Sequence, residues 1–149
     1  MPIQMDVISE AERWLRTRLL SETSITDVFG DRVFSYPGPR YNEDNERITY
    51  PILTYEFMYP QPDTVLVGST RFWSTLRFKV IGTTKGNDAI DIGVGAQAIY
   101  TSLQGKYGYT DGAVISGCYE DRPYQDVELM SSTQYIHKGG EYVILINTI

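Results

Sequence analysis

The chain has 149 residues, a length that suits one domain, because division into two would leave neither half enough residues for a core. Its 13 basic and 19 acidic residues give a formal net charge of −6. This balance argues against a protein that grips DNA or a membrane surface, since phosphate binding needs clustered Lys and Arg. A single cysteine, Cys118, excludes an internal disulfide and a cysteine-rich zinc site, so we expect no metal and no cofactor.

The N-terminal region predicts a helix over residues 6–21, because its apolar residues repeat at intervals of three and four. The next segment predicts a short helical turn over residues 25–29, which Gly30 would end. Residues 32–35 read as a short strand. Residues 36–49 hold two prolines, several Asn and Asp residues and no periodicity, which indicates an exposed loop. We expect no membrane-spanning segment and no signal peptide, since no apolar run is long enough and acidic residues stand near the start.

Two strands are predicted in the middle of the chain. The first covers residues 50–59, and residues 60–69 read as a loop that leads to the second strand at residues 70–82. The second strand alternates strictly, with a buried face that includes Leu76 and Phe78 and a wet, basic face that includes Arg71, Trp73 and Arg77.

The spacing of apolar residues then changes from two to three and four, and residues 87–104 predict a second helix. Gly93 and Gly95 are costly inside a helix, which suggests a helix pressed closely onto a sheet. Residues 113–119 read as a buried strand and residues 122–126 as a turn or loop. Gly139-Gly140 predicts a tight hairpin turn between strands at residues 133–137 and 141–149.

This order of elements predicts an α+β domain spanning residues 1–149, with a mainly antiparallel β-sheet and two amphipathic helices packed on one face. No residues stand out as catalytic. Cys118 lies in a predicted strand and is expected to be a small buried hydrophobe, and His137 is expected to be an exposed hairpin residue. Glu120 and Asp121 should point to opposite faces of a strand and therefore should not share a site.

The basic face has two readings. Cations that alternate with an aromatic residue on a strand can bind single-stranded nucleic acid. Three cations, Arg71, Arg77 and Lys79, are few on an acidic chain, so a solvated face or one that meets a partner subunit is the favoured interpretation.

The order of segments resembles the tail-completion, or tail terminator, proteins of long-tailed bacteriophages. The resemblance rests on the amphipathic helix at residues 11–20, the Gly30-Asp31-Arg32-Val33-Phe34 step and the strand that starts Tyr50-Pro51-Ile52-Leu53. It continues through the strand at residues 74–80, the helix end at residues 99–103 and the closing strand at residues 142–146.

The resemblance implies a structural protein without enzymatic activity. It implies a homo-hexameric ring in the virion neck that caps the finished tail tube, ends its polymerisation and joins the tail to the head connector. DNA would pass through the lumen without specific binding, which the net negative charge favours. The virion would assemble in the cytoplasm of a bacterial host, and no membrane would be involved.

Two groups of residues are candidates for subunit or partner contact. The first lies on the basic strand face, and the second lies in the two long polar loops. The candidates are Arg71, Trp73, Arg77, Arg40, Tyr41, Asp63 and Val65. Two other functions stay open, namely a head-closure (stopper) protein of the neck, and a small ligand-binding or enzymatic α+β domain.

Overall fold

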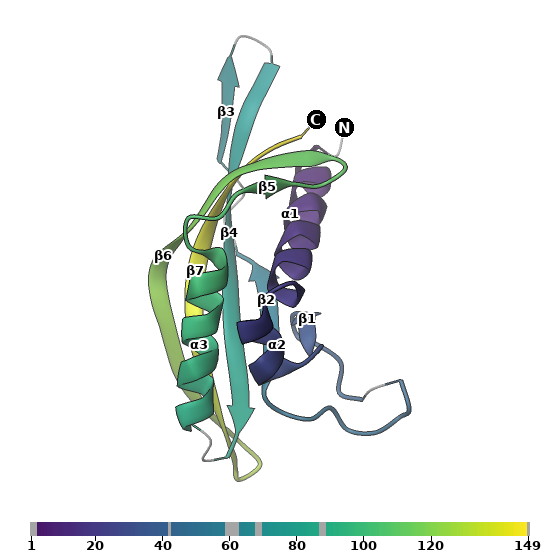
Figure 1. Ribbon diagram of the computed structural model, residues 1–149, viewed down its shortest axis with the longest axis vertical. Coiled ribbons are helices and arrows are strands. Elements are labelled where there is room, and N and C mark those ends of the chain that lie inside the picture. The colour runs from purple at the N-terminus through teal and green to yellow at the C-terminus, as the bar shows by residue number, and fades with distance from the viewer. Residues whose placement is uncertain (1–2, 42, 59–62, 68–69, 87–88, 149) are drawn as a thin grey trace.

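The fold is built on the long strand β7 (Thr133–Thr148), which pairs on both sides along most of its length (Figure 1). On one side it pairs with β4 (Thr70–Lys85), and on the other it pairs with β6 (Ala113–Met130), both antiparallel. The computed structural model describes residues 3–41, 43–58, 63–67, 70–86 and 89–148. Within these residues the three long strands form the centre of a seven-stranded sheet.

The shorter strands extend this sheet at both edges. β2 (Ile52–Phe57) pairs antiparallel with β4, and β1 (Val33–Ser35) then adds parallel to β2. β5 (Gly108–Tyr109) pairs with the start of β6. β3 (Asp63–Val67) pairs with the first residues of β4, beyond the point where β2 ends. The prediction of a mainly antiparallel sheet is therefore confirmed.

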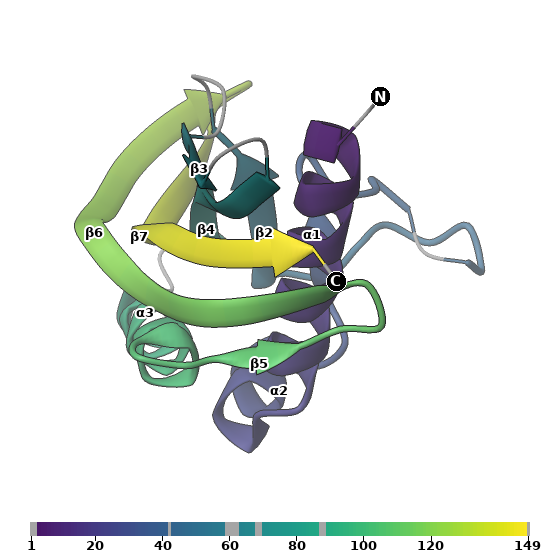
Figure 2. The ribbon, with the colours of Figure 1, turned by 90° about the horizontal axis from the view of Figure 1, so that it is seen from above.

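In the described residues, three helices cover one face of the sheet, which curves around them (Figures 1 and 2). They are α1 (Ile3–Leu20), α2 (Thr23–Phe29) and α3 (Ala89–Leu103). The expected helical turn before Gly30 is a seven-residue helix, so the face carries three helices where the sequence indicated two. None of these helices has the combination of length and apolar character that crossing a membrane requires.

The core lies between the helices and the inner face of the sheet, which is the face that the helices cover. Alternate residues of β4 point into it, as the period-two pattern predicts, and Leu76, Phe78 and Val80 are fully buried. The same core takes the apolar stripe of α1 and the buried side of α3. Its largest fully buried side chains are Tyr142, Phe29, Phe78, Leu15, Leu19, Ile25, Leu53, Leu76, Ile92, Ile99, Leu103 and Ile115.

The hairpin turn of the C-terminal half does not lie at Gly139-Gly140, so that prediction is wrong. β7 runs straight through both glycines, and the turn lies at Ser131 and Ser132, whose φ angles are 50° and 68°. The predicted loop at residues 122–126 is likewise part of β6. Serine rarely adopts positive φ, so the sequence carried no sign of this turn.

The two glycines are needed for close packing inside β7. A Cβ on Gly139 would collide with the main chain of β4 at Val80, and a Cβ on Gly140 would meet the carboxyl group of Glu120. The Gly-Gly dipeptide usually marks a turn. In this protein it lets three strands approach one another closely.

Strand β3 was not predicted. Its residues follow a segment with two prolines, and the sequence pattern predicts a loop through Gly68 there. In the structure β3 and the start of β4 form a hairpin, with Val65 opposite Trp73. We call residues 63–67 and 70–75 the arm, since they extend beyond the body of the fold (Figure 1).

The glycines of α3 have unequal roles. A Cβ on Gly95 would lie 2.7 Å from the Phe29 ring of α2, whereas a Cβ on Gly93 would meet nothing within 4 Å. Phe29 also lies 2.7 Å from the position of a Cβ on Gly82 in β4. Gly95 therefore allows contact with α2, where the sequence analysis expected both glycines to face the sheet.

Cys118 is a core residue, as predicted. Only 1% of its surface is exposed, and burial raises the pKa of its thiol to about 12. A thiol of this kind stays protonated at neutral pH and has little access to reagents.

The helix α3 offers a matched pair of substitutions. We expect Gly95→Ala to lower the free energy of unfolding by about 1–3 kcal/mol, because the methyl group collides with Phe29. We expect Gly93→Ala to raise it by up to about 1 kcal/mol, because the position is open and alanine favours the helix. Urea unfolding followed by circular dichroism measures both, and equal effects of the two changes would contradict this packing.

The thiol of Cys118 should be unreactive in the folded protein. A thiol-reactive dye at pH 8 should label the native chain far more slowly than the chain unfolded in guanidinium, because the thiol is buried and protonated. Labelling of the native protein at the rate of a free cysteine would contradict the placement of Cys118 in the core.

Candidate interaction site

The segment between β1 and β2 projects from the body of the fold and carries two of the candidate contact residues, Arg40 and Tyr41 (Figure 1). It has internal order, since Tyr41 and Arg47 form an isolated antiparallel bridge and the Ile48 amide donates to the Arg40 carbonyl at 3.0 Å. Arg40 is exposed, and 51% of the Tyr41 surface is exposed. Both predicted contact residues are therefore accessible to a partner.

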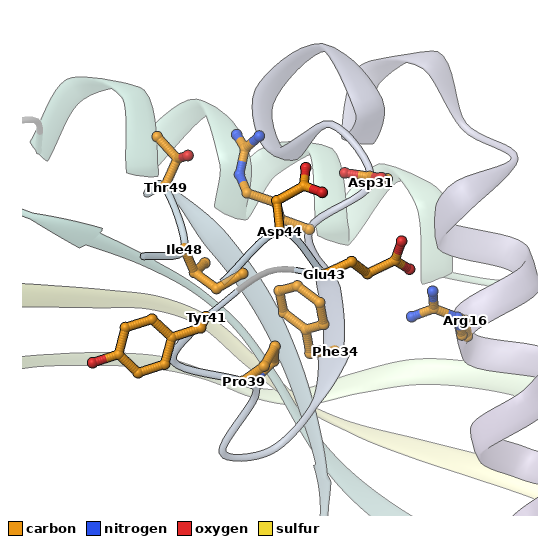
Figure 3. Close-up of a pocket in the computed structure, with 10 residues that line it drawn as sticks. Arg16, Asp31, Phe34, Pro39, Tyr41, Glu43, Asp44, Ile48 and Thr49 are labelled. Atoms are coloured by element: carbon orange, nitrogen blue, oxygen red, sulfur yellow. The ribbon is translucent and has the colours of Figure 1, made fainter. Parts of the chain in front are cut away.

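A hollow of about 670 Å³ lies on the α1 side of this loop (Figure 3). Two cations and three carboxylates line it around the ring of Phe34, which makes its chemistry polar and mixed in charge. Arg16 donates to the carbonyl of Val33, and Arg32 donates through Nε to the carbonyl of Pro51 at 3.0 Å. These contacts tie α1 and the loop ends to the first strands. The lining residues are Arg16, Asp31, Arg32, Phe34, Pro39, Tyr41, Glu43, Asp44, Ile48 and Thr49.

A second hollow, of about 660 Å³, lies on the other side of the same loop, over the outer face of the sheet, which is the face without helices. The tip of the β6–β7 hairpin forms its opposite wall. Tyr41 lines both hollows. The rings of Tyr50 and Tyr135 pack at a tilt, with centroids 5.6 Å apart and an interplanar angle of 60°. Burial, together with the neighbouring Tyr135, raises the pKa of Tyr50. A pair of aromatic rings thus lies next to the C-terminal end of the loop.

His137 lines this second hollow from within β7, and the prediction of an exposed residue is wrong. Its side chain is 16% exposed. Its Nδ1 lies 2.8 Å from the Thr83 hydroxyl, and its Nε2 lies 3.1 Å from the Glu128 carboxylate. The three residues come from β4, β7 and β6, so this chain of contacts joins the three central strands.

Cys118 and His137 do not meet. Cys118 packs in the core on the inner face, whereas His137 lies on the outer face beside Thr83. No nucleophile–base pair can form between side chains on opposite faces of one sheet.

Two cations of the outer face, Arg77 and Lys79, are engaged within the chain, and the side chain of Arg71 lies outside the described part. Arg77 forms an ion pair with Asp121, which raises the pKa of Arg77. The Lys79 ammonium lies 4.5 Å from the centre of the Tyr124 ring. Arg77 remains partly exposed, as predicted, but the acidic and aromatic residues of β6 shield both charges. This weakens the alternative reading of a face that binds single-stranded nucleic acid, since that reading needs free cations.

Four candidate contact residues belong to the arm. Asp63 and Val65 lie in β3, where the sequence analysis expected a loop, and Arg71 and Trp73 lie opposite β3 in β4. Their backbone positions are described, and their side chains lie outside the described part. The seven candidates therefore fall in two separate regions. One is the loop between β1 and β2, and the other is β4 together with the arm.

The neighbouring carboxylates Glu120 and Asp121 do not share a site, as predicted. Glu120 lies against Gly140 on the inner face, and Asp121 pairs with Arg77 on the outer face. A β-bulge separates them, since the register of β6 shifts between Glu120 and Arg122. Among the residues whose side chains are described, no group of three His, Cys, Asp or Glu residues is placed to hold a metal ion.

Comparison with known proteins gives one informative result. No protein-family model matches the sequence, and no curated protein matches it either. Among solved structures, the fold is similar to a chain of the virion of a native gene transfer agent particle, with a TM-score of 0.70 and 12% sequence identity. The match covers 95% of this chain and 98% of that chain, so the two share the whole fold.

Proposed function

We propose that this chain is a structural protein of a phage-like virion, and that it serves as a tail terminator. The observation that carries the proposal is the end-to-end similarity of its fold to a chain of a gene transfer agent virion. The segment order of the sequence, which resembles tail-completion proteins, supports the same role. The protein would sit in the virion neck as a homo-hexamer between the tail tube and the head connector or stopper.

The distribution of exposed features suits a protein that makes several contacts. The loop at residues 36–49 and the arm project from different parts of the fold (Figure 1). A ring subunit needs surfaces for two neighbours and for partners above and below it. The formal charge of −6 favours a lumen that DNA can slide through, because acidic walls repel phosphates.

The first test is the mass of the purified protein in solution, measured by light scattering over a concentration series. We expect a closed species near six times the 17.0 kDa of one chain. A monomer at every concentration, including in the presence of tail tube protein, would contradict the ring.

The second test concerns the loop. We expect Arg40→Glu combined with Tyr41→Ala to weaken binding to the tail tube or the connector, because both side chains are exposed on the loop, while the mass of the ring stays unchanged. Pull-down with purified tube protein and with purified connector measures this. Lys106→Glu, which changes one charge between α3 and β5, serves as the control. Binding to the portal or adaptor and not to the tube would instead indicate the head-closure role.

A further inference from the structure

Strand β6 has a free edge over residues 124–130. β5 covers its other side only at Val114 and Ile115. Beyond that point, no strand in the described part of the chain pairs with β6 on the side away from β7. The middle of β6 has two features that protect edges, a bulge and Pro123. Residues 124–130 contain no Pro, Gly, Lys or Arg and no shift of register, and their charged residues are Asp126 and Glu128.

Three large aliphatic side chains are exposed along this edge, among the polar residues Gln125, Asp126 and Glu128. Val127 is 54% exposed, Leu129 is 73% exposed and Met130 is 50% exposed. Large aliphatic residues exposed on an unpaired strand are typical of a surface that another strand covers.

The backbone of the edge is also oriented for pairing. The amide of Val127 donates to its own neighbour Asp126 at Oδ1, at 2.9 Å, so this N–H points away from β7. In an antiparallel ladder alternate residues share that direction, and Pro123, which has no N–H, falls at such a position. Gln125 and Leu129 therefore also present their backbone groups outward.

The arm carries the complementary feature. β3 pairs with β4 on one side only, and its main contacts in the described chain are with β4. A two-stranded hairpin is marginally stable by itself in water. The sequence of β3, Asp63-Thr64-Val65-Leu66-Val67, is rich in residues that favour a covered strand.

We propose that β3 of one copy adds as a strand to the free edge of β6 in the next copy. The inference rests on the proposed ring and names its interface. The chain itself supplies both halves, a projecting strand and a free acceptor edge, and the arm and the β6–β7 tip lie at opposite ends of the molecule (Figure 1). Pairing of two different surfaces is heterologous, and a heterologous contact can close into a ring.

Disulfide cross-linking tests this contact directly. Thr64→Cys and Val65→Cys are each combined with Val127→Cys, so that adjacent positions of β3 are sampled. Cys118 can stay in place, because its thiol is buried and we expect it not to react in the folded protein. Under mild oxidation at a concentration that gives the ring, we expect at least one pair to form a ladder of covalent species up to the hexamer.

The single variants give the control. Val127→Cys alone should remain a monomer on denaturing gels, because two β6 edges do not meet. Covalent dimers from Val127→Cys alone would overturn the inference in favour of a two-fold contact between β6 edges. A ring of the expected mass with no ladder from either pair would overturn the interface and leave the proposed function standing. Absence of any ring would overturn the proposed function itself.

A proline substitution gives a second measurement. Val127→Pro removes an N–H that does not bond to β7, so the fold should remain, and the thermal melting of the monomer checks this. In the assembled ring a carbonyl of the incoming strand would replace Asp126 as the acceptor of this N–H. We expect the concentration needed for assembly to rise by roughly tenfold or more, because that hydrogen bond is lost and the incoming strand meets the proline ring. Leu129→Thr, which keeps the backbone donor, should raise it less. Unchanged assembly in Val127→Pro would contradict strand addition at this edge.

Discussion

The fold depends on the pairing of β7 with β4 and β6 at the same time. The three strands come so close at Gly139 and Gly140 that neither position has room for a side chain. Because all three strands are long, this single constraint fixes the register of most of the sheet. β2, β1, β5 and β3 then add to edges that the three strands define.

The same arrangement gives the sheet an inner face that the helices cover and an outer face that they leave open. The helices and the core occupy the inner face, and Phe29 joins α2 to α3 and β4 where Gly95 and Gly82 leave space for its ring. The outer face holds the hollow beside the loop, where His137 links Thr83 to Glu128 across three strands. The hydrophobic core thus lies on one side of the sheet, and polar contacts between strands lie on the other.

The three regions proposed to contact partners, namely the loop, the arm and the free edge of β6, all border this sheet. The loop joins β1 to β2, the arm continues β4 past the end of β2, and the free edge belongs to the far end of β6. Of the predicted contact residues, Arg40, Tyr41 and Arg77 are exposed, and Arg77 is held by Asp121. The free edge was missed by sequence reasoning, because an exposed Val127 or Leu129 in a strand looks the same in sequence as a buried one.

Local periodicity was sufficient to identify the helices at α1 and α3, the strand β4 with its buried face, and the core position of Cys118, because each depends on the pattern of neighbouring residues. The turn of the β6–β7 hairpin depends on something else. Gly139-Gly140 has the composition of a turn, but contacts with β4 and β6 hold it in a continuous strand, and Ser131-Ser132 turns in its place. The sequence by itself therefore determined which residues are apolar enough to form the core. Only the tertiary structure decided where the long strands reverse and which edge stays open, since these follow from contacts between segments far apart in the chain.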